Sequence, residues 1–134
     1  MRSRQLELDT DRHLVTDITD QVAAFCQEGS GDGLVHVFLP HATAGLALME
    51  TGSGSEEDLQ AALEGLFPRE DRYAHRHGSV GHGGDHLLPV VISPSLVLPV
   101  QNGRLVLGTW QRVVIVDPNR ENRRRTVQLR LLEG

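Results

Sequence analysis

The 134-residue sequence lacks several features, and each absence excludes a class of protein. Cys26 is the single cysteine, so the chain forms no internal disulfide bond. No apolar run approaches the roughly 18 residues that a membrane-spanning helix requires. Residues 1–14 contain no apolar signal core, so we expect a cytoplasmic protein without a membrane partner. The net charge of −5 argues against a nucleic-acid partner, because nucleic-acid binders usually present a basic surface.

Aromatic residues are also scarce, at 4% of the chain, so aliphatic side chains must fill the core. Hydrophobic residues account for 39% and charged residues for 23%, an ordinary globular composition. The length suits one domain spanning residues 1–134, since neither a linker nor a repeat divides it.

Hydrophobic periodicity predicts an α+β fold. A first helix is expected within residues 16–29 with Thr19 as its N-cap, and a second from the cap Ser55 to Pro68. Strands are predicted at residues 3–10, 34–39, 44–50, 86–92, 95–100, 104–110, 112–117 and 126–132. The last five runs follow one another, which indicates antiparallel hairpins or a meander.

Histidine is the side chain best suited to metal binding and to proton transfer near neutral pH. The chain has seven, of which four lie in or beside the irregular segment 69–85, at positions 75, 77, 82 and 86. A long irregular segment in a small domain is commonly functional or mobile. The spacing matches no standard zinc signature, so a metal or catalytic site and a solvated loop both stay open.

The stretch "HATAG", residues 41–45, separates two predicted strands. Its small residues, with Thr43 and Gly45, allow backbone N–H groups to approach an anionic ligand, although a plain turn has the same composition. If the two strands pair, Glu50 lies far from His41 and faces another element, a neighbouring chain or solvent. His36 alternates with core positions and is expected to be a packed or interface residue.

Two further segments offer binding groups. Trp110 is either a core residue or a stacking wall for a ring, and Gln111 beside it offers a donor and an acceptor. The arginine-rich stretch "NRENRRR", residues 119–125, either binds phosphate or forms a solvated turn.

Four segments in this order resemble the YjbQ-like family, UPF0047, also called the secondary thiamine-phosphate synthase family. They are "GLVHVFLPHATAGLALME", "EEDL", "YAHRHG" and "HLLPVVISPSLVLPVQNGRLVLGTWQ", and the resemblance covers about residues 5–133. It implies a curled, mainly antiparallel sheet with two principal helices. It also implies a homotrimer with sites near the subunit boundaries.

The resemblance further implies a site and a reaction. Catalytic roles fall on His41, Glu50, Asp58 and His86. Substrate contacts fall on Thr43, Gly45, Trp110 and Gln111. A divalent cation, zinc above others, would be held by His41, His75 and His86.

The implied reaction is a thiamine-phosphate synthase-type transfer between phosphorylated small molecules. The alternative is a non-enzymatic trimer that binds a metal or an anion. Three positions depart from the family pattern, namely Ala42, His82 and Leu88, and they put unchanged substrate recognition in doubt.

Overall fold

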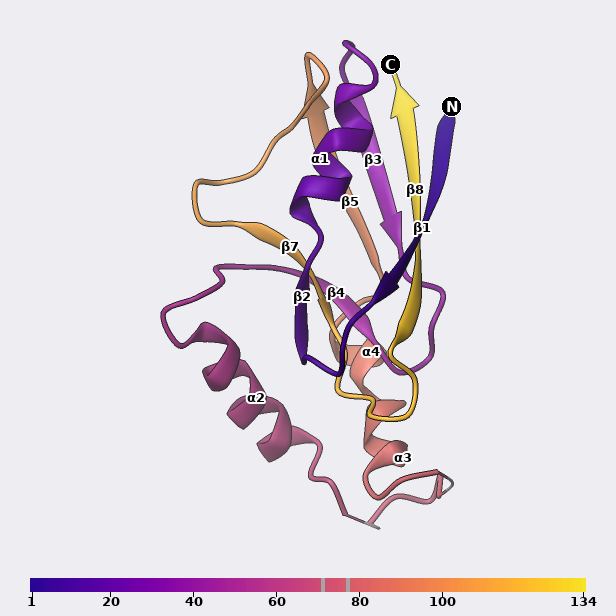
Figure 1. Cartoon of the computed structure of the whole chain (residues 1–134), viewed down its shortest axis with the longest axis vertical. Helices are drawn as coiled ribbons and strands as arrows, with labels where there is room; N and C mark the ends of the chain where they lie inside the picture. Colours follow the sequence, from indigo (N-terminus) through magenta and orange to yellow (C-terminus); the bar gives the residue numbers. More distant parts are fainter. Residues whose placement is uncertain (71, 77) are drawn as a thin grey trace.

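Two antiparallel sheets form the body of the molecule (Figure 1). The computed structural model describes residues 1–70, 72–76 and 78–134. One sheet has five strands in the order β1-β8-β3-β5-β6, and the other has three in the order β2-β7-β4. The strands are β1 (Arg2–Asp9), β2 (Val15–Asp17), β3 (Gly33–Phe38), β4 (Gly45–Met49), β5 (Ser95–Gln101), β6 (Arg104–Leu105), β7 (Arg112–Val116) and β8 (Arg124–Glu133). This arrangement confirms the predicted α+β fold with a curled antiparallel sheet.

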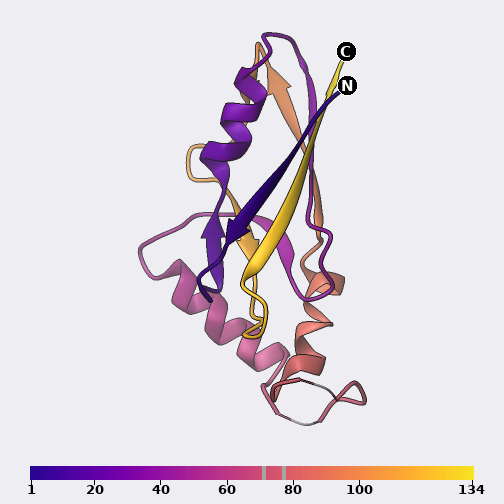
Figure 2. The ribbon, with the colours of Figure 1, turned by 45° about the vertical axis from the view of Figure 1, so that its right-hand side comes forward.

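Two principal helices lie on different sides of the three-stranded sheet (Figure 2). Helix α1 (Thr19–Gln27) packs against β6, β7 and β8, and α2 (Ser55–Leu66) runs along the outer side. Two four-residue helices, α3 (His82–Asp85) and α4 (Leu88–Val91), lie at the lower end in Figure 1. Within the described residues, no helix has both the length and the apolar character needed to cross a bilayer. The cytoplasmic location stays a prediction.

Strand β7 is buried on both faces and therefore separates two hydrophobic cores. Val113 and Ile115 face the larger core, which lies between the two sheets and α1. Val114 and Val116 face the smaller core under α2 and α4. Because successive side chains of a strand point to opposite faces, one continuous apolar run serves both cores.

Three local predictions were wrong. Residues 86–92 form helical turns, because a short apolar run does not distinguish a buried strand from a helix, and Pro89 suits a first helical turn. Only Arg104–Leu105 of the predicted strand 104–110 pairs with a neighbour. The N-caps are Ile18 and Gly54 in place of Thr19 and Ser55, and neither has a side chain that caps the helix. At α1 the carboxylate of Asp17, one residue before the N-cap, accepts the Thr19 N–H at 2.9 Å instead.

The strand connections also differ from a meander. Among the described strands, β5 and β6 are the only neighbours in both sequence and sheet. Strands β3 and β4, which flank the turn at His41, belong to different sheets. The turn is therefore a crossover between the sheets, and Glu50 is placed by β4 rather than by a hairpin with β3.

Candidate metal centre

Three histidines converge at the lower end of the molecule, around α3 (Figure 1). His82 is the first residue of α3 and His86 is its C-cap, so the two rings lie one helical turn apart on the same face. Their Nε2 atoms are 2.9 Å apart. His75 arrives from the preceding loop, with its ring centroid 4.4 Å from that of His86 and 5.8 Å from that of His82.

This spacing fits a divalent cation. One ligand nitrogen from each histidine lies within 4.8 Å of the other two. Tetrahedral zinc, with Zn–N bonds of about 2.05 Å, holds its ligand nitrogens about 3.3 Å apart. A shift of roughly 1.5 Å or less therefore brings the three nitrogens to that spacing. Imidazole donors suit zinc and neighbouring transition metals better than magnesium or calcium.

A carboxylate orients the His82 ring. Glu121 Oε1 lies 3.1 Å from His82 Nδ1, and the Asn119 amide nitrogen lies 3.4 Å from the same atom. A proton on Nδ1 that is donated to Glu121 leaves the Nε2 lone pair pointing into the cluster, as at many histidine–metal sites. The Glu121 carboxylate accepts hydrogen bonds from the backbone N–H and from the hydroxyl of Ser79. These bonds, of which the one from the backbone N–H has the larger effect, hold the pKa of Glu121 below its usual range. Glu121 is therefore ionised at neutral pH.

Asp85 ties α3 to the loop that carries Glu121. Its carboxylate accepts hydrogen bonds from Arg69 Nη1 at 2.6 Å and Nη2 at 3.2 Å, and from Asn119 Nδ2 at 3.2 Å. Asn119 Oδ1 in turn accepts the backbone N–H groups of Glu121 and Asn122. The side chain of Asp85 is 2% exposed, so these bonds compensate for the burial of its charge. No sequence pattern pointed to Asp85, and Asn119 and Glu121 were considered only as part of the arginine-rich stretch 119–125.

A close backbone approach holds the His75 segment against α3. A Cβ on Gly83 would collide with the carbonyl oxygen of His75 and with the side chain of Tyr73. Tyr73 is fixed by its hydroxyl, which donates to the Pro68 carbonyl at 2.7 Å. The Gly-Gly pair after His82 is thus required because the loop passes directly over the helix.

A cavity of about 170 Å³ borders the cluster. Its walls include His75, His82, Arg76 and Ser79. A cavity volume of roughly 10–15 Å³ is enough to hold one water molecule, so this cavity admits a small ligand as well as solvent.

His41 lies outside the histidine cluster of the described chain. Its Nε2 accepts the backbone N–H of Thr126 at 2.9 Å, which links the crossover turn to β8. Burial, followed by the positive charge of Arg125, lowers the pKa of His41. The ring is therefore neutral at pH 7. Its predicted role as a metal ligand has no support from the cluster within one chain.

Thr43 and Gly45 have structural neighbours where a ligand was expected. The Thr43 hydroxyl accepts a hydrogen bond from Arg125 Nη2 at 2.9 Å. Arg125 also forms a buried ion pair with Asp117, at 2.6 Å. A Cβ on Gly45 would collide with the carbonyl of Ile92, so the protein backbone itself makes the close approach. The predicted substrate contacts of both residues stay predictions.

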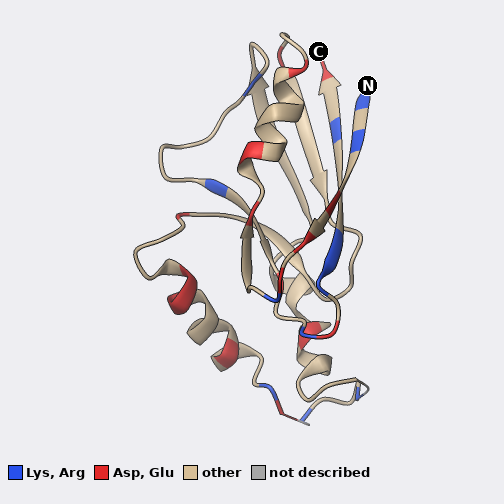
Figure 3. Ribbon diagram, in the orientation of Figure 1, with Lys and Arg blue, Asp and Glu red and all other residues tan. Residues whose placement is uncertain are grey.

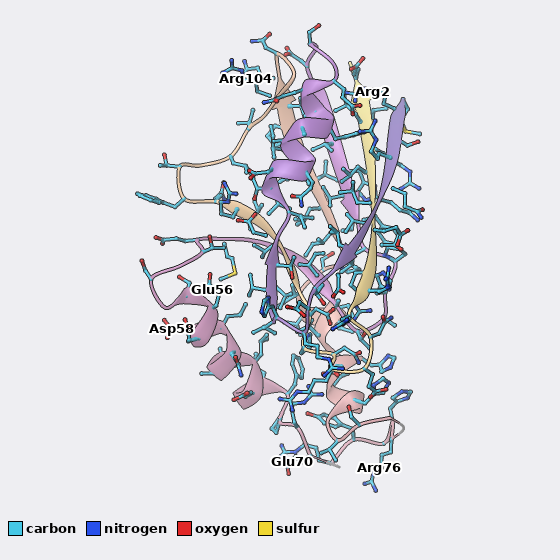
Figure 4. The ribbon with its side chains drawn as sticks, viewed as in Figure 1. Arg2, Glu56, Asp58, Glu70, Arg76 and Arg104 are labelled. Atoms are coloured by element: carbon cyan, nitrogen blue, oxygen red, sulfur yellow. The ribbon has the colours of Figure 1, made fainter. Side chains whose placement is uncertain are left out.

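The remaining predicted site residues are exposed and lie away from α3. Glu50 directly follows β4, and Asp58 projects outward from the start of α2 (Figure 4). Trp110 is 71% exposed, and Gln111 accepts a hydrogen bond within its own turn at 2.8 Å. One chain therefore does not gather these four residues around the histidines. His77 lies outside the described residues.

The three departures from the family pattern have different surroundings. His82 is a member of the histidine cluster. Leu88 is 1% exposed and fills the smaller core. Ala42 is exposed on the crossover turn. The departure at position 82 therefore supplies a potential metal ligand.

The fold and the cluster together define a small α+β protein that presents three histidines at one end of two antiparallel sheets. The model of the family "UPF0047 protein YjbQ-like" matches residues 4–134, and the chain belongs to this family. A UPF0047 protein of Mycobacterium bovis is 55% identical over 129 residues, which cover 96% of this chain and 99% of that relative. A UPF0047 protein of Archaeoglobus fulgidus is 38% identical over 125 residues, covering 92% of this chain and 96% of that relative. The crystal structure of a hypothetical protein from Aeropyrum pernix K1 is similar over 100% of both chains, with a TM-score of 0.90 and 32% identity.

Proposed function

We propose that the chain binds a divalent cation, zinc above others, through His75, His82 and His86, and that this centre acts on phosphorylated small molecules. The convergence of the three ligand nitrogens within 4.8 Å carries the proposal. His82 replaces His41 in the set of ligands that the family resemblance implied. Glu121 orients His82, and Asp85 holds the loop of Glu121 against α3 through its hydrogen bond from Asn119.

The proposed reaction joins a pyrimidine pyrophosphate to a thiazole phosphate and releases pyrophosphate. It rests on the family resemblance, and the histidine cluster supports it by offering a place for positive charge. A bound cation supplies neutralisation of the departing phosphate charge. The side chain of Arg76 borders the same cavity and adds a permanent positive charge there.

Elemental mass spectrometry of the purified, untagged chain tests the metal site. We expect about one divalent ion per chain in the wild type, and loss of that ion in His75→Ala, His82→Ala and His86→Ala. His13→Ala is the matched control, because this histidine is exposed and belongs to no cluster of the described residues. His41→Ala should also keep the ion. Loss of metal in His41→Ala with retention in His82→Ala would refute the assignment of ligands.

A second candidate function is metal or anion binding without catalysis. It is favoured by the position of Glu50 and Asp58, the predicted catalytic carboxylates, which are exposed and away from the cluster within one chain. Pyrophosphate release from the two proposed substrates distinguishes the functions. Release by the wild type and by His13→Ala, but not by His82→Ala, supports the enzyme. A metal-loaded wild type that releases none leaves the binding function.

We also propose the homotrimer that the resemblance implies. The outer face of the five-stranded sheet exposes Leu34, Val97 and Leu132, at 46%, 59% and 60%. Leu34 and Leu132 are direct cross-strand partners, so the exposed side chains are adjacent. Light scattering should give three times the chain mass for the wild type and a smaller mass for Leu132→Asp. Leu66→Asp is the matched control, since Leu66 is 63% exposed on α2. A monomeric wild type would rule out the trimer.

A further inference from the structure

A second cavity, of about 120 Å³, borders Asp85 but none of the three histidines. It lies between the end of α2, the turn before β2 and the loop that follows β7. Leu14, Phe67 and Leu88 supply apolar wall. One water molecule needs roughly 10–15 Å³ of cavity volume, so this cavity has room for on the order of ten water-sized groups.

Three arginines from distant parts of the sequence line this cavity: Arg12, Arg69 and Arg120. Figure 3 shows basic positions from separate segments near the lower end of the molecule, where α2 ends. The chain has a net charge of −5, and all 13 of its basic residues are arginines, so such a grouping is not a by-product of a basic composition. Arginine binds phosphate and carboxylate groups through paired N–H donors.

Three acidic residues line the same wall, Glu64, Asp85 and Asp117, and two of them are already paired with arginines. Glu64 offsets one further positive charge, so one arginine charge of the wall stays uncompensated. Asp117 is paired with Arg125, which lies outside the cavity wall. Asp85 is paired with Arg69. Within the described residues, Arg12 and Arg120 take part in none of the ion pairs.

Two further observations concern the arginines themselves. The buried Nε of Arg69 has no hydrogen-bond acceptor among the described residues, although its two terminal nitrogens bind Asp85. Arg12 has a φ of 60° and follows Asp11 with a φ of 50°, a left-handed conformation that costs about 1 kcal/mol or more per residue away from glycine. Strain of this kind is found preferentially where a side chain is held for a function.

We propose that this cavity binds a small organic phosphate, with the phosphate between Arg12 and Arg120 and the apolar part against Leu14, Phe67 and Leu88. The apolar wall selects an organic ester over the free ion, and the arginines select an anion over a neutral ring. The site is separate from the proposed metal centre, because no histidine of that centre lines the cavity. It also gives a role to Arg120, which belongs to the arginine-rich stretch 119–125.

Isothermal titration calorimetry of the untagged chain with phenyl phosphate tests the inference, in a buffer without phosphate. The variants are Arg12→Gln and Arg120→Gln, whose side chains are exposed and form no ion pair among the described residues, so the fold should survive. Arg104→Gln is the matched control, because this exposed arginine lies at the opposite end of the molecule (Figure 4). Circular dichroism confirms folding of each variant.

We expect one site per chain, binding about tenfold weaker in each of the two cavity variants and unchanged in the Arg104 control. His82→Ala should bind phenyl phosphate like the wild type, and inorganic phosphate and phenol should each bind more weakly than phenyl phosphate. Three results would overturn the proposal. They are absence of binding to the wild type, equal binding by the cavity variants, or loss of binding in His82→Ala, which would move the phosphate to the histidines.

Discussion

Replacing Glu121 by glutamine should weaken zinc binding without removing a zinc ligand. The carboxylate lies 3.1 Å from His82 Nδ1 and accepts two further hydrogen bonds from Ser79. Glutamine keeps the shape and one acceptor oxygen, so the change removes chiefly the negative charge that favours a proton on Nδ1. Loss of such an orienting partner typically costs between about 10-fold and 100-fold in metal affinity. Because most of the hydrogen bonds can persist, we expect a loss near the lower value, about tenfold.

Competition with a chelating zinc indicator at pH 7.4 measures this change directly. Glu57→Gln is the matched control, since Glu57 is an exposed glutamate on α2 and should leave the affinity unchanged. Glu121→Ala, which removes the acceptor entirely, should fall closer to the 100-fold end of the range. The pKa of Glu121 is lowered in the folded chain, so its carboxylate is ionised at the pH of the assay. Equal zinc affinity in wild type and both Glu121 variants would refute the proposed orientation of His82.

Three other predictions test the surroundings of the cluster. The pKa of His41 is lowered in the folded chain, so the wild type should lose stability as pH falls through the unfolded value of about 6.5. In urea unfolding between pH 7.5 and 5.5, His41→Gln should lose less stability than the wild type. Parallel pH profiles of the two proteins would contradict this. Asp117→Ala leaves the buried charge of Arg125 unpaired and should lower the free energy of unfolding by about 3–5 kcal/mol. A loss below about 1 kcal/mol would contradict this prediction. Gly83→Ala should displace His75 and lower zinc affinity while the far-ultraviolet circular dichroism stays unchanged; wild-type affinity would show that the predicted collision is relieved elsewhere.

The fold was predictable where burial imposes a period on the sequence. In β3, Val35 and Val37 are fully buried while the alternating Leu34 is 46% exposed, and this alternation is visible in the residues themselves. The pairing of the strands was not predictable in the same way. Strand β8 lies between β1 and β3, and such pairing depends on contacts between residues far apart in the chain. A local pattern contains no information about them.

The candidate site shows the same division. His75 and His86 were assigned as ligands from the family motif. His82 was noted in the histidine-rich segment but was left out of the ligand set as a departure from the motif. The signal that could have found it is the spacing of four residues between His82 and His86. That spacing brings two rings together on a helix but not on a loop that leads into a strand. The wrong assignment of residues 86–92 to a strand therefore concealed the cluster.

Asp85 connects the two proposed sites, and this determines which substitutions can separate them. It binds Arg69, which lines the second cavity, and Asn119, which approaches His82. Side-chain exposures of 2% for Asp85 and 17% for Arg69 mean that removing either partner leaves a poorly solvated charge, which is strongly destabilising. A variant at this pair would therefore disturb metal binding, phosphate binding and folding together. The exposed residues Glu121 and Arg120 each act on one site alone, so their variants can attribute a loss of binding to one site without confusing it with a loss of structure.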